Sequence, residues 1–448
     1  MKLEGARVLV IGMGRSGLAA VELARERGAV VEAVDERSLE ELPAASERLA
    51  ALGVSFRRQS EADWEGWDLI VVSPGVPADL APLEAARRRG THVIGDLELA
   101  SWFLQGPVIA ITGSNGKTTT TALAGHILHE ARIPAQVGGN IGWAPCAMVA
   151  TSRPGQWNVL EVSSFQLETI ERFRAEVGAV LNITPDHLDR HRTFERYAAA
   201  KRRLLETQTA ADVKILNRDD PTCRAFAGVG GRTVWFSSRE RLEQGAWLEE
   251  GHIWLDGAPL LAAGEVPLRG RHNLENVMAA ALAAHQAGAG REAIAAAVRS
   301  FAGVEHRLEF VRRVRGVDYY NDSKATNVDA ALKALESFAG PLWVILGGKD
   351  KDADYGPLRA ALAEKARGAL LIGAAAEKIG RALQGAVPLV ECGTLEAAVE
   401  EAARRARPGD TVLLAPACAS FDQFENFEHR GRVFKAAVAR LVEEDGCA

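Results

Sequence analysis

The feature that most constrains the fold is an alternation that runs along the chain. Short apolar runs are followed by helical stretches rich in alanine, leucine and arginine. Runs of this kind are typical of buried strands, and the longer amphipathic stretches are typical of helices. Strands that alternate with helices form parallel sheets covered by helices on both faces. We therefore predict an α/β protein, and the sequence contains no repeat, heptad array or low-complexity tract.

The chain is long enough for several domains. Its 448 residues exceed a single ordinary core, and length alone predicts about three domains. The motifs described below separate three blocks, residues 1–96, 97–302 and 303–448. One stretch of the middle block, residues 232–261, has short alternating runs, from RTVWFSSRE to GAPLL. That pattern predicts a small antiparallel insertion.

Composition and charge narrow the class of protein. With 47% hydrophobic and 25% charged residues, the chain has the composition of a packed globular protein. A formal net charge of -6 does not indicate a protein that binds nucleic acid or an anionic membrane, because both partners attract positively charged proteins. No apolar run approaches the roughly 20 residues that span a bilayer, so we predict a cytoplasmic protein. The scattered cysteines form no CxxC pair and are expected to be reduced thiols: Cys146, Cys223, Cys392, Cys418 and Cys447.

The strongest local motif is a phosphate-binding loop. PVIAITGSNGKTTTTALAGHIL has the order strand, glycine turn, Lys-Thr and amphipathic helix. Backbone N–H groups of such a turn and the positive end of the helix dipole bind phosphate. The lysine contacts the β/γ-phosphates, and the threonine hydroxyl binds Mg²⁺. The motif departs from GxxxxGK[ST], because Ile111 stands where the first glycine belongs, and an ordinary βα turn is the alternative. The predicted ATP-binding residues are Gly113, Ser114, Asn115, Gly116, Lys117, Thr118 and Thr119.

Two further predicted strands are expected to end near this loop. WNVLEV delivers Glu161 and AVLNIT is followed by His187. Because the carboxyl ends of parallel strands share one edge of a sheet, Glu161 is predicted to bind the same Mg²⁺. For His187, a metal ligand and a structural hydrogen-bond partner remain equally open.

The first block contains the dinucleotide fingerprint. Gly12, Gly14 and Gly17 form GxGxxG between a strand and a helix, and Asp35 ends the next strand. That rule alone predicts that this block binds NAD. Physically, the motif requires only that a diphosphate lies at a helix N-terminus and that a carboxylate lies near a ribose hydroxyl. Any nucleotide diphosphate can make these two contacts. Because an ATP loop follows in the next block, a nucleotide-sugar substrate is the favoured ligand here.

The third block gathers polar residues after three predicted strands, in NDSKATN, GGKDKDADY and CASFDQFENF. Lysines, hydroxyls and backbone N–H groups of this kind suit an acidic amino acid. The alternative is structural, with the next helix capped by Asp322, Ser323 and Thr326 and the lysines solvated at the surface. The residues alone leave both interpretations open.

Taken in order, the motifs resemble the Mur ligase family through essentially the whole chain. The segments that carry the resemblance are TGSNGKTTTT, EVSSFQLE, NITPDHLDRH, RGRHNLEN, HRLE, NDSKATN, LGGKDKDADY and APACASFDQFENFEHRG. SSFQLE, NDSKATN and CASFDQF are most similar to the member that adds D-glutamate. The resemblance implies a Rossmann-like uridine-nucleotide domain, a central P-loop ATPase-like domain with a parallel sheet, and a Rossmann-like C-terminal domain that binds the amino acid.

The same resemblance implies an ATP-dependent ligase of peptidoglycan precursor synthesis, expected to be a monomer. The L-alanine carboxylate of UDP-N-acetylmuramoyl-L-alanine would attack the γ-phosphate of ATP to give an acyl phosphate. The amine of D-glutamate would then displace phosphate. Such chemistry depends mainly on positioning and on charge neutralisation, for which two Mg²⁺ ions are implied.

The resemblance also assigns roles residue by residue. Catalytic roles fall to Lys117, Glu161, His187 and Lys201, and metal binding to Thr118, Glu161, His187 and a carbamylated Lys201. Further ATP contacts are Asn273, Arg307 and Asp322. The nucleotide-substrate residues are Gly14, Arg15, Ser16, Asp35, Glu36, Arg37, Gly75, Asn140 and His187. The D-glutamate residues are Ser323, Lys324, Thr326, Lys351, Ser420 and Phe427, with Lys349 as the alternative to Lys351.

Other functions remain as alternatives. A sister ligase that adds L-alanine or diaminopimelate has the same ATP site, whereas a folylpolyglutamate synthetase would lack the first block. A regulatory nucleotide-binding module with a degenerate ATP site is disfavoured by the presence of Lys117, Thr118, Glu161 and His187. An NAD-dependent oxidoreductase would have no use for the phosphate loop.

Overall fold

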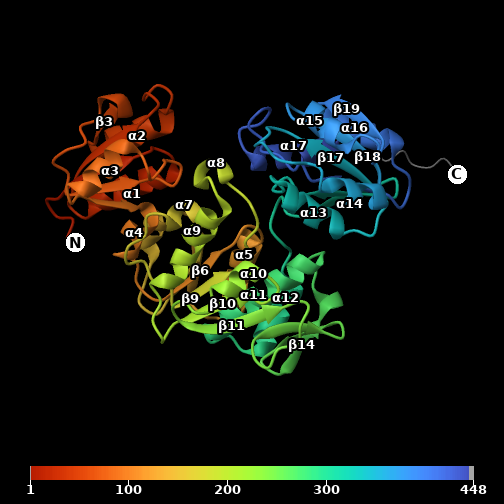
Figure 1. Ribbon diagram of the computed structural model, residues 1–448, viewed down its shortest axis with the longest axis horizontal. Helices are drawn as coiled ribbons and strands as arrows, with labels where there is room; N and C mark the ends of the chain where they lie inside the picture. The colour runs from red at the N-terminus through yellow and green to blue at the C-terminus, as the bar shows by residue number, and fades with distance from the viewer. Residues whose placement is uncertain (1, 443–448) are drawn as a thin grey trace. The chain divides into compact units, whose positions relative to one another are not determined.

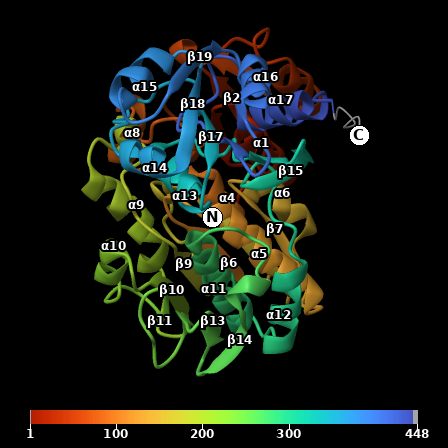
Figure 2. The same ribbon diagram turned by 90° about the vertical axis from the view of Figure 1, so that its right-hand side faces the viewer.

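The computed structural model describes residues 2–442 and divides into two compact units (Figures 1 and 2). The first unit comprises the chain up to Glu265 together with Glu275–Ser300, and the second comprises Val266–Leu274 together with the chain from Phe301. The first unit contains a five-stranded and a nine-stranded sheet, and the second contains a six-stranded sheet. Among the described residues, no helix has both the length and the apolar character needed to cross a bilayer.

The N-terminal sheet is parallel throughout, with strand order β3-β2-β1-β4-β5. The order reverses between β1 and β4, and open parallel sheets bind ligands beyond the strand ends at such a point. Its strands are β1 (Arg7–Ile11), β2 (Val30–Asp35), β3 (Ser55–Arg58), β4 (Leu69–Val72) and β5 (His92–Gly95). Its helices are α1 (Arg15–Glu26), α2 (Pro43–Leu52), η1 (Gln59–Glu61), α3 (Ala81–Arg88) and α4 (Asp96–Ser101).

The central sheet has the order β14-β13-β12-β11-β10-β9-β6-β8-β7. Its strands are β6 (Val108–Thr112), β7 (Ala135–Gly139), β8 (Trp157–Glu161), β9 (Val177–Val180), β10 (Val213–Asn217), β11 (Arg232–Ser237), β12 (Ala246–Glu249), β13 (His252–Leu255) and β14 (Ala258–Ala262). The helices of this region are α5 (Lys117–Glu130), α6 (Pro145–Met148), η2 (Val149–Thr151), α7 (Ser164–Leu167), α8 (Leu188–His191), α9 (Phe194–Glu206), α10 (Pro221–Ala225), η3 (Ala263–Glu265), α11 (Arg271–Gln286) and α12 (Arg291–Ser300). Strands β6 and β8–β10 are almost wholly buried, which explains their continuous apolar runs.

The predicted small antiparallel insertion is confirmed for β12–β14 but is wrong for β11. Strand β11 pairs parallel with β10, and β12 pairs parallel with β11. Only β12–β14 form an antiparallel meander, and it continues the central sheet. Backbone groups of a strand need hydrogen-bond partners, so the stretch extends the existing edge.

The second unit has strand order β15-β16-β20-β17-β18-β19, in which β15 is an antiparallel edge strand and the others are parallel. Apolar clusters pack on both faces. Its strands are β15 (Glu309–Val314), β16 (Val317–Asn321), β17 (Leu342–Gly347), β18 (Ala366–Ile372), β19 (Leu389–Gly393) and β20 (Thr411–Leu414). Its helices are α13 (Val328–Glu336), α14 (Leu358–Lys365), α15 (Ala376–Leu383), α16 (Leu395–Arg405) and α17 (Phe427–Ala439).

The predicted α/β class with parallel sheets is confirmed. The domain boundaries near residues 96 and 302 stay predictions. Cys146, Cys223, Cys392 and Cys418 are free thiols, as expected, and Cys447 lies outside the described residues.

Candidate active site

The predicted phosphate loop joins β6 to α5. Gly113 and Gly116 have φ angles of 154° and 87°, which favour glycine. A side chain at Gly116 would also collide with Asn276. Gly116 is the N-cap of α5 and makes no side-chain cap, and the positive end of this helix dipole lies at the turn, where it favours a phosphate. The turn therefore fits the phosphates of a nucleotide.

Lys117 holds a positive charge at this turn. Its Nζ donates to the carbonyl oxygens of Gly113 and Ser114, both at 2.8 Å. Ser114 does not project freely, because its hydroxyl lies 2.9 Å from both the backbone oxygen of Thr184 and the hydroxyl of Tyr197. The lysine is thus placed to offset phosphate charge, whereas the Ser114 side chain fixes the loop.

Two side chains with oxygen atoms, Thr118 and Glu161, are hydrogen-bonded to each other beside the loop. The Thr118 hydroxyl donates to Glu161 Oε2 at 2.6 Å, and the Asn140 amide donates to Glu161 Oε1 at 2.8 Å. Glu161 is the last residue of β8 and Asn140 directly follows the neighbouring β7. A hydroxyl and a carboxylate are the hard donors that Mg²⁺ prefers, so this pair fits the ion.

Lys201 is buried behind the loop, with 1% of its surface exposed. Its Nζ donates to Gly113 O at 2.8 Å and lies 4.7 Å from the centroid of the Tyr197 ring. Burial, reinforced by the charge of Lys117, holds the pKa of Lys201 well below its usual range. A neutral amine is the form that reacts with carbon dioxide to give a carbamate.

The amphipathic pattern of α9 could have revealed Lys201 from the sequence. Tyr197, Ala198, Leu204 and Leu205 form the buried face of this helix, and Lys201 falls on that face. A lysine on the apolar stripe of a helix is unusual, since lysine is almost never fully buried.

His187 lies in the segment after β9 and has a left-handed φ of 53°. Its ring packs edge-on against Phe165 with 4.9 Å between centroids, and its Nε2 lies 3.7 Å from an Asp186 oxygen. Phe165 stacks on His191, and His191 contacts Tyr197 at 5.3 Å. This aromatic cluster connects the His187 region to the phosphate loop.

A cavity of about 630 Å³ lies at the carboxyl ends of the N-terminal strands. Every predicted nucleotide-substrate residue except His187 lines it: Gly14, Arg15, Ser16, Asp35, Glu36, Arg37, Gly75 and Asn140. Gln59 and Ser73 also line it and were not predicted. The cavity includes the N-terminal turn of α1, where a diphosphate is favoured.

Asp35 fixes the glycine turn of this cavity. Its carboxylate accepts hydrogen bonds from the Met13 amide at 2.7 Å and from the Arg37 amide and Nε at 3.0 and 3.1 Å. Burial raises the pKa of Asp35, but the bonds from Arg37 and Met13 outweigh it, and the pKa falls below its usual value. The carboxylate is therefore ionised, and its predicted ribose contact stays a prediction.

In the second unit, the three predicted polar segments lie at the carboxyl ends of β16, β17 and β20. The Lys349 amide donates to Ala419 O at 2.9 Å, which joins two of these segments. The Ser323 hydroxyl donates to Phe427 O at 2.8 Å, and Lys324 Nζ lies 3.6 Å from the Phe427 ring centroid. Ser420 is buried in the third segment, while Thr326 is partly exposed.

Arg430, which the sequence analysis did not single out, organises this region. The side chain is fully buried, and burial lowers its pKa to about 10. Its guanidinium donates to Ser323 Oγ and O at 3.0 and 2.7 Å and to the carbonyls of Cys418 and Ala419. Ser323 is therefore held by the protein itself.

The proposed helix capping by Asp322, Ser323 and Thr326 is wrong. Asn327 caps α13 by accepting a 2.8 Å hydrogen bond from the Ala330 amide. Burial raises the pKa of Asp322 to about 7, opposed by the charge of Arg307.

Lys349 and Lys351 are both exposed, so the choice between them stays open. Asn273, whose amide donates to Arg269 O at 2.7 Å, belongs to the second unit with Arg307 and Asp322. The ATP contacts of these three residues stay predictions.

Sequence models of three protein-family domains match most of the chain. The Mur ligase MurD-like N-terminal domain matches residues 6–95, the Mur ligase middle domain residues 111–284, and the Mur ligase glutamate ligase domain residues 306–418. The chain belongs to the Mur ligase family.

Individual relatives agree with this assignment. The UDP-N-acetylmuramoylalanine–D-glutamate ligase of Solibacter usitatus is 61% identical, over 99% of this chain and 100% of that protein. The ligase of the same name from Koribacter versatilis is 48% identical, over 99% and 100%.

Solved structures show the same fold. The pseudomurein peptide ligase type C of Methanothermus fervidus superposes with a TM-score of 0.63 at 19% identity, covering 97% of this chain and 99% of that one. MurF ligase from Thermotoga maritima, in complex with ADP, has a TM-score of 0.62 at 17% identity, with 97% and 95% covered.

Proposed function

We propose that the chain is an ATP-dependent ligase that joins D-glutamate to UDP-N-acetylmuramoyl-L-alanine in peptidoglycan precursor synthesis. Its likeness to two ligases of that name covers nearly the whole chain. The observation that carries the proposal is the grouping of Lys117, Thr118 and Glu161 at one glycine turn. This grouping supplies a cation, a hydroxyl and a carboxylate where a nucleotide triphosphate and its metal need them.

The reaction proceeds in two steps. A carboxylate oxygen of the L-alanine residue attacks the γ-phosphorus of ATP, the bond to the β-phosphate oxygen breaks, and ADP leaves. The D-glutamate amine then attacks the acyl carbon, loses a proton, and phosphate leaves as the amide forms. Loop N–H groups and Lys117 hold the phosphates and offset their charge throughout.

Mg²⁺, when bound, neutralises the charge that builds up on the transferring phosphate oxygens. Thr118 and Glu161 are the proposed ligands of a first ion, and His187 with carbamylated Lys201 those of a second. The carbamate is supported by the burial of Lys201 and its lowered pKa. Addition of carbon dioxide with loss of a proton turns a buried amine into a carboxylate, which balances the nearby charge of Lys117.

The cavity lined by Asp35 and Asn140 is the proposed site of the uridine diphosphate. Asn140 also holds Glu161, so it connects this cavity to the metal ligands. D-Glutamate is assigned to the polar segments of the second unit, with Lys324, Thr326, Ser420, Phe427 and either Lys349 or Lys351. Ser323 acts there by positioning, since Arg430 and Phe427 O engage it.

Two substitutions test the assignment of these sites. Lys117→Ala should abolish turnover while circular dichroism and the thermal midpoint stay near wild type, and retained ligase activity would remove the phosphate-loop assignment. Lys349→Ala and Lys351→Ala should differ, with only the residue that binds D-glutamate raising the apparent KM for D-glutamate. Equal KM values in both variants and wild type would move the amino-acid site elsewhere.

The cellular setting follows from the substrates. ATP and UDP-linked precursors are cytoplasmic metabolites, so we place the enzyme in the cytoplasm. We also propose that it acts as a monomer. Sedimentation at assay concentrations should give a mass near the 48.0 kDa of one chain, and a larger mass would contradict this.

A further inference from the structure

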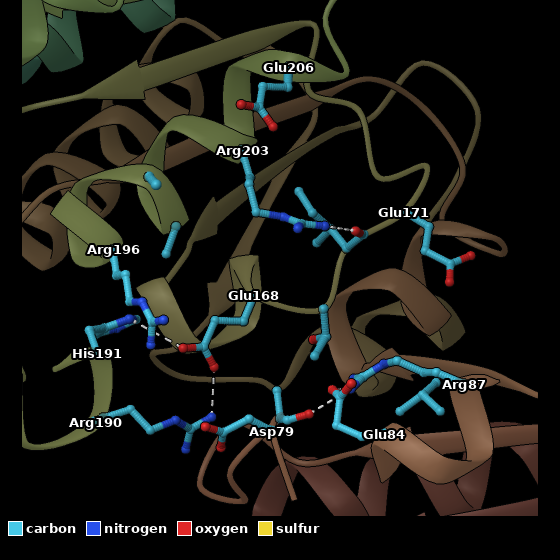
Figure 3. Close-up of a pocket in the computed structure, with 16 residues that line it drawn as sticks. Asp79, Glu84, Arg87, Glu168, Glu171, Arg190, His191, Arg196, Arg203 and Glu206 are labelled. Carbon is cyan, nitrogen blue, oxygen red and sulfur yellow. Dashed lines mark hydrogen bonds and ion pairs between the residues drawn. The ribbon is translucent and has the colours of Figure 1, made fainter. Parts of the chain in front are cut away.

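A second cavity in the first unit, of about 660 Å³, is used by none of the roles described above. Figure 3 shows it between α9, the segment after α7, and the region around α3. It shares no lining residue with the cavity assigned to the uridine nucleotide. Its volume is in the range of small-molecule sites.

The carboxylates that line this cavity are matched by basic neighbours. Glu168 bonds to Arg190 at 2.7 Å and lies 3.3 Å from His191, as the dashed lines in Figure 3 show. Every other lining carboxylate also lies near a basic side chain, in the pairs Glu84–Arg87, Asp79–Arg192, Glu171–His92 and Glu206–Arg202. The acidic side of the lining is therefore largely compensated.

Two lining arginines are not compensated in this way. Within residues 2–442, neither Arg196 nor Arg203 has a carboxylate partner. Arg203 donates one N–H to the backbone oxygen of Ile170, while its buried Nε has no hydrogen-bond partner. A buried donor without an acceptor is costly, and an anion in the cavity would remove that cost.

The two arginines lie on one face of α9. They are seven residues apart, two helical turns, and the residues between them that line the cavity are Ala199 and Ala200. The small alanine side chains leave room between the two guanidinium groups. Figure 3 labels both arginines on this helix.

We propose that this cavity binds a small dianion, with carboxylate or phosphate groups held by Arg196 and Arg203. Guanidinium groups bind both classes of anion through paired N–H donors. Another face of α9 carries Tyr197 and Lys201, which contact the phosphate loop. His191, which lines the cavity, also contacts the Tyr197 ring. Binding is independent of the proposed ligase activity, whereas an effect on turnover rests on it.

Calorimetric titration of the full chain with succinate and, separately, with inorganic phosphate tests the site. Arg196→Ala and Arg203→Lys should each weaken binding by about tenfold or more, since each loses paired donors to the anion. Arg88→Ala is the matched control, because Arg88 is exposed on α3 and does not line the cavity. It should bind as wild type does, and binding should persist with saturating UDP present.

Three results would overturn the proposal: no binding of either anion, equal affinity in all variants, or displacement by UDP. If phosphate binding vanishes in Lys117→Ala, phosphate binds at the phosphate loop and is not a ligand of this cavity. Binding of one anion alone would identify its class. If binding follows the prediction but no ligase activity is found with any acceptor, the anion site stands and the proposed function fails.

Discussion

The Thr118 hydroxyl donates a 2.6 Å hydrogen bond to Glu161 Oε2, which joins the first turn of α5 to the end of β8. The two residues are 43 positions apart in the sequence. They meet because β8 lies next to β6, the strand that enters the phosphate loop. This relationship places the two oxygens that are proposed to bind Mg²⁺ near the phosphate loop, and it is the structural basis of the proposed ATP chemistry.

Removing the Thr118 hydroxyl should impair metal use. Thr118→Val loses an oxygen that binds Glu161 and, by proposal, Mg²⁺, so the Mg²⁺ concentration for half-maximal phosphate release should rise by about tenfold or more. Thr118→Ser should restore most of the activity, because it keeps the hydroxyl. Phosphate release measured against Mg²⁺ concentration checks both variants.

Thr121→Val is the matched control on the same helix. The Thr121 hydroxyl is buried and, within the described part of the chain, has no hydrogen-bond partner. Its replacement by an isosteric methyl should leave the Mg²⁺ dependence unchanged. Equal losses in both variants would show that the hydroxyl of Thr118 has no special role.

Substitution of Lys201 should be rescued by small carboxylates. Lys201→Ala removes the proposed carbamate, so activity should fall, and added acetate should restore part of it by filling the space with a carboxylate. Bicarbonate should not restore activity, because no amine remains to react with it. Near-normal activity of Lys201→Ala without additives would remove the carbamate from the mechanism.

Lys214 provides the control for a buried lysine. Its Nζ donates to the carbonyl oxygens of Val229 and Gly231, which is a structural role. Lys214→Met should lower the thermal midpoint without any response to acetate. Rescue of this variant by acetate would show that the effect is not specific to Lys201.

Asp96 should make stability depend on pH. Burial raises its pKa to about 6, although hydrogen bonds from Ser16, Gln166 and the Leu97 amide oppose the shift. Between about pH 4 and 6 the folded state holds a proton on Asp96 that the unfolded chain has released. Its stabilising contribution is therefore present below about pH 4 and is lost as pH rises through 6.

Asp96→Asn removes this titration. The unfolding free energy of wild type relative to the variant should fall by about 3 kcal/mol between pH 4 and 7, because a shift of about two pKa units corresponds to that amount. Urea titrations across this pH range measure it. Asp63→Asn, at an exposed position, should follow the wild-type curve. Parallel curves for wild type and Asp96→Asn would contradict the assignment.

Arg430 should be essential to the second unit. Arg430→Met removes the guanidinium donor to the carbonyls of Cys418 and Ser323, while Ala419 O keeps the Lys349 amide, so the variant should lose about 3 kcal/mol or more in urea unfolding. Arg432→Ala, on the exposed side of α17, is the control and should change stability little. Equal midpoints of the two variants would show that the buried guanidinium is dispensable.

Local sequence predicted most of the strands but not those without apolar runs. The sequence analysis did not predict four strands, in which glycines or charged residues interrupt the apolar run and which all lie at sheet edges: β3 (SFRR), β7 (AQVGG), β15 (EFVRRV) and β19 (LVECG). The parallel pairing of β11 could not be read from its own residues either. A strand's partner depends on the rest of the sheet, which local periodicity does not encode.

The candidate site was predictable where chemistry follows a strand end. Lys117, Thr118 and Glu161 lie at glycine turns and strand ends, so their type and position indicated a function. Arg430 could not be found in this way, because its partners are backbone carbonyls from distant segments. The tie between Asn140 and Glu161 likewise depends on the adjacency of β7 and β8.

The most direct test of the account is phosphate release from ATP and Mg²⁺ with UDP-N-acetylmuramoyl-L-alanine, comparing D-glutamate, L-glutamate, L-alanine and diaminopimelate as acceptors. The account predicts release only when both the nucleotide substrate and D-glutamate are present, and none in Lys117→Ala. Release with another amino acid would make the chain a sister ligase with the same ATP site. Absence of release with every acceptor would contradict the proposed function.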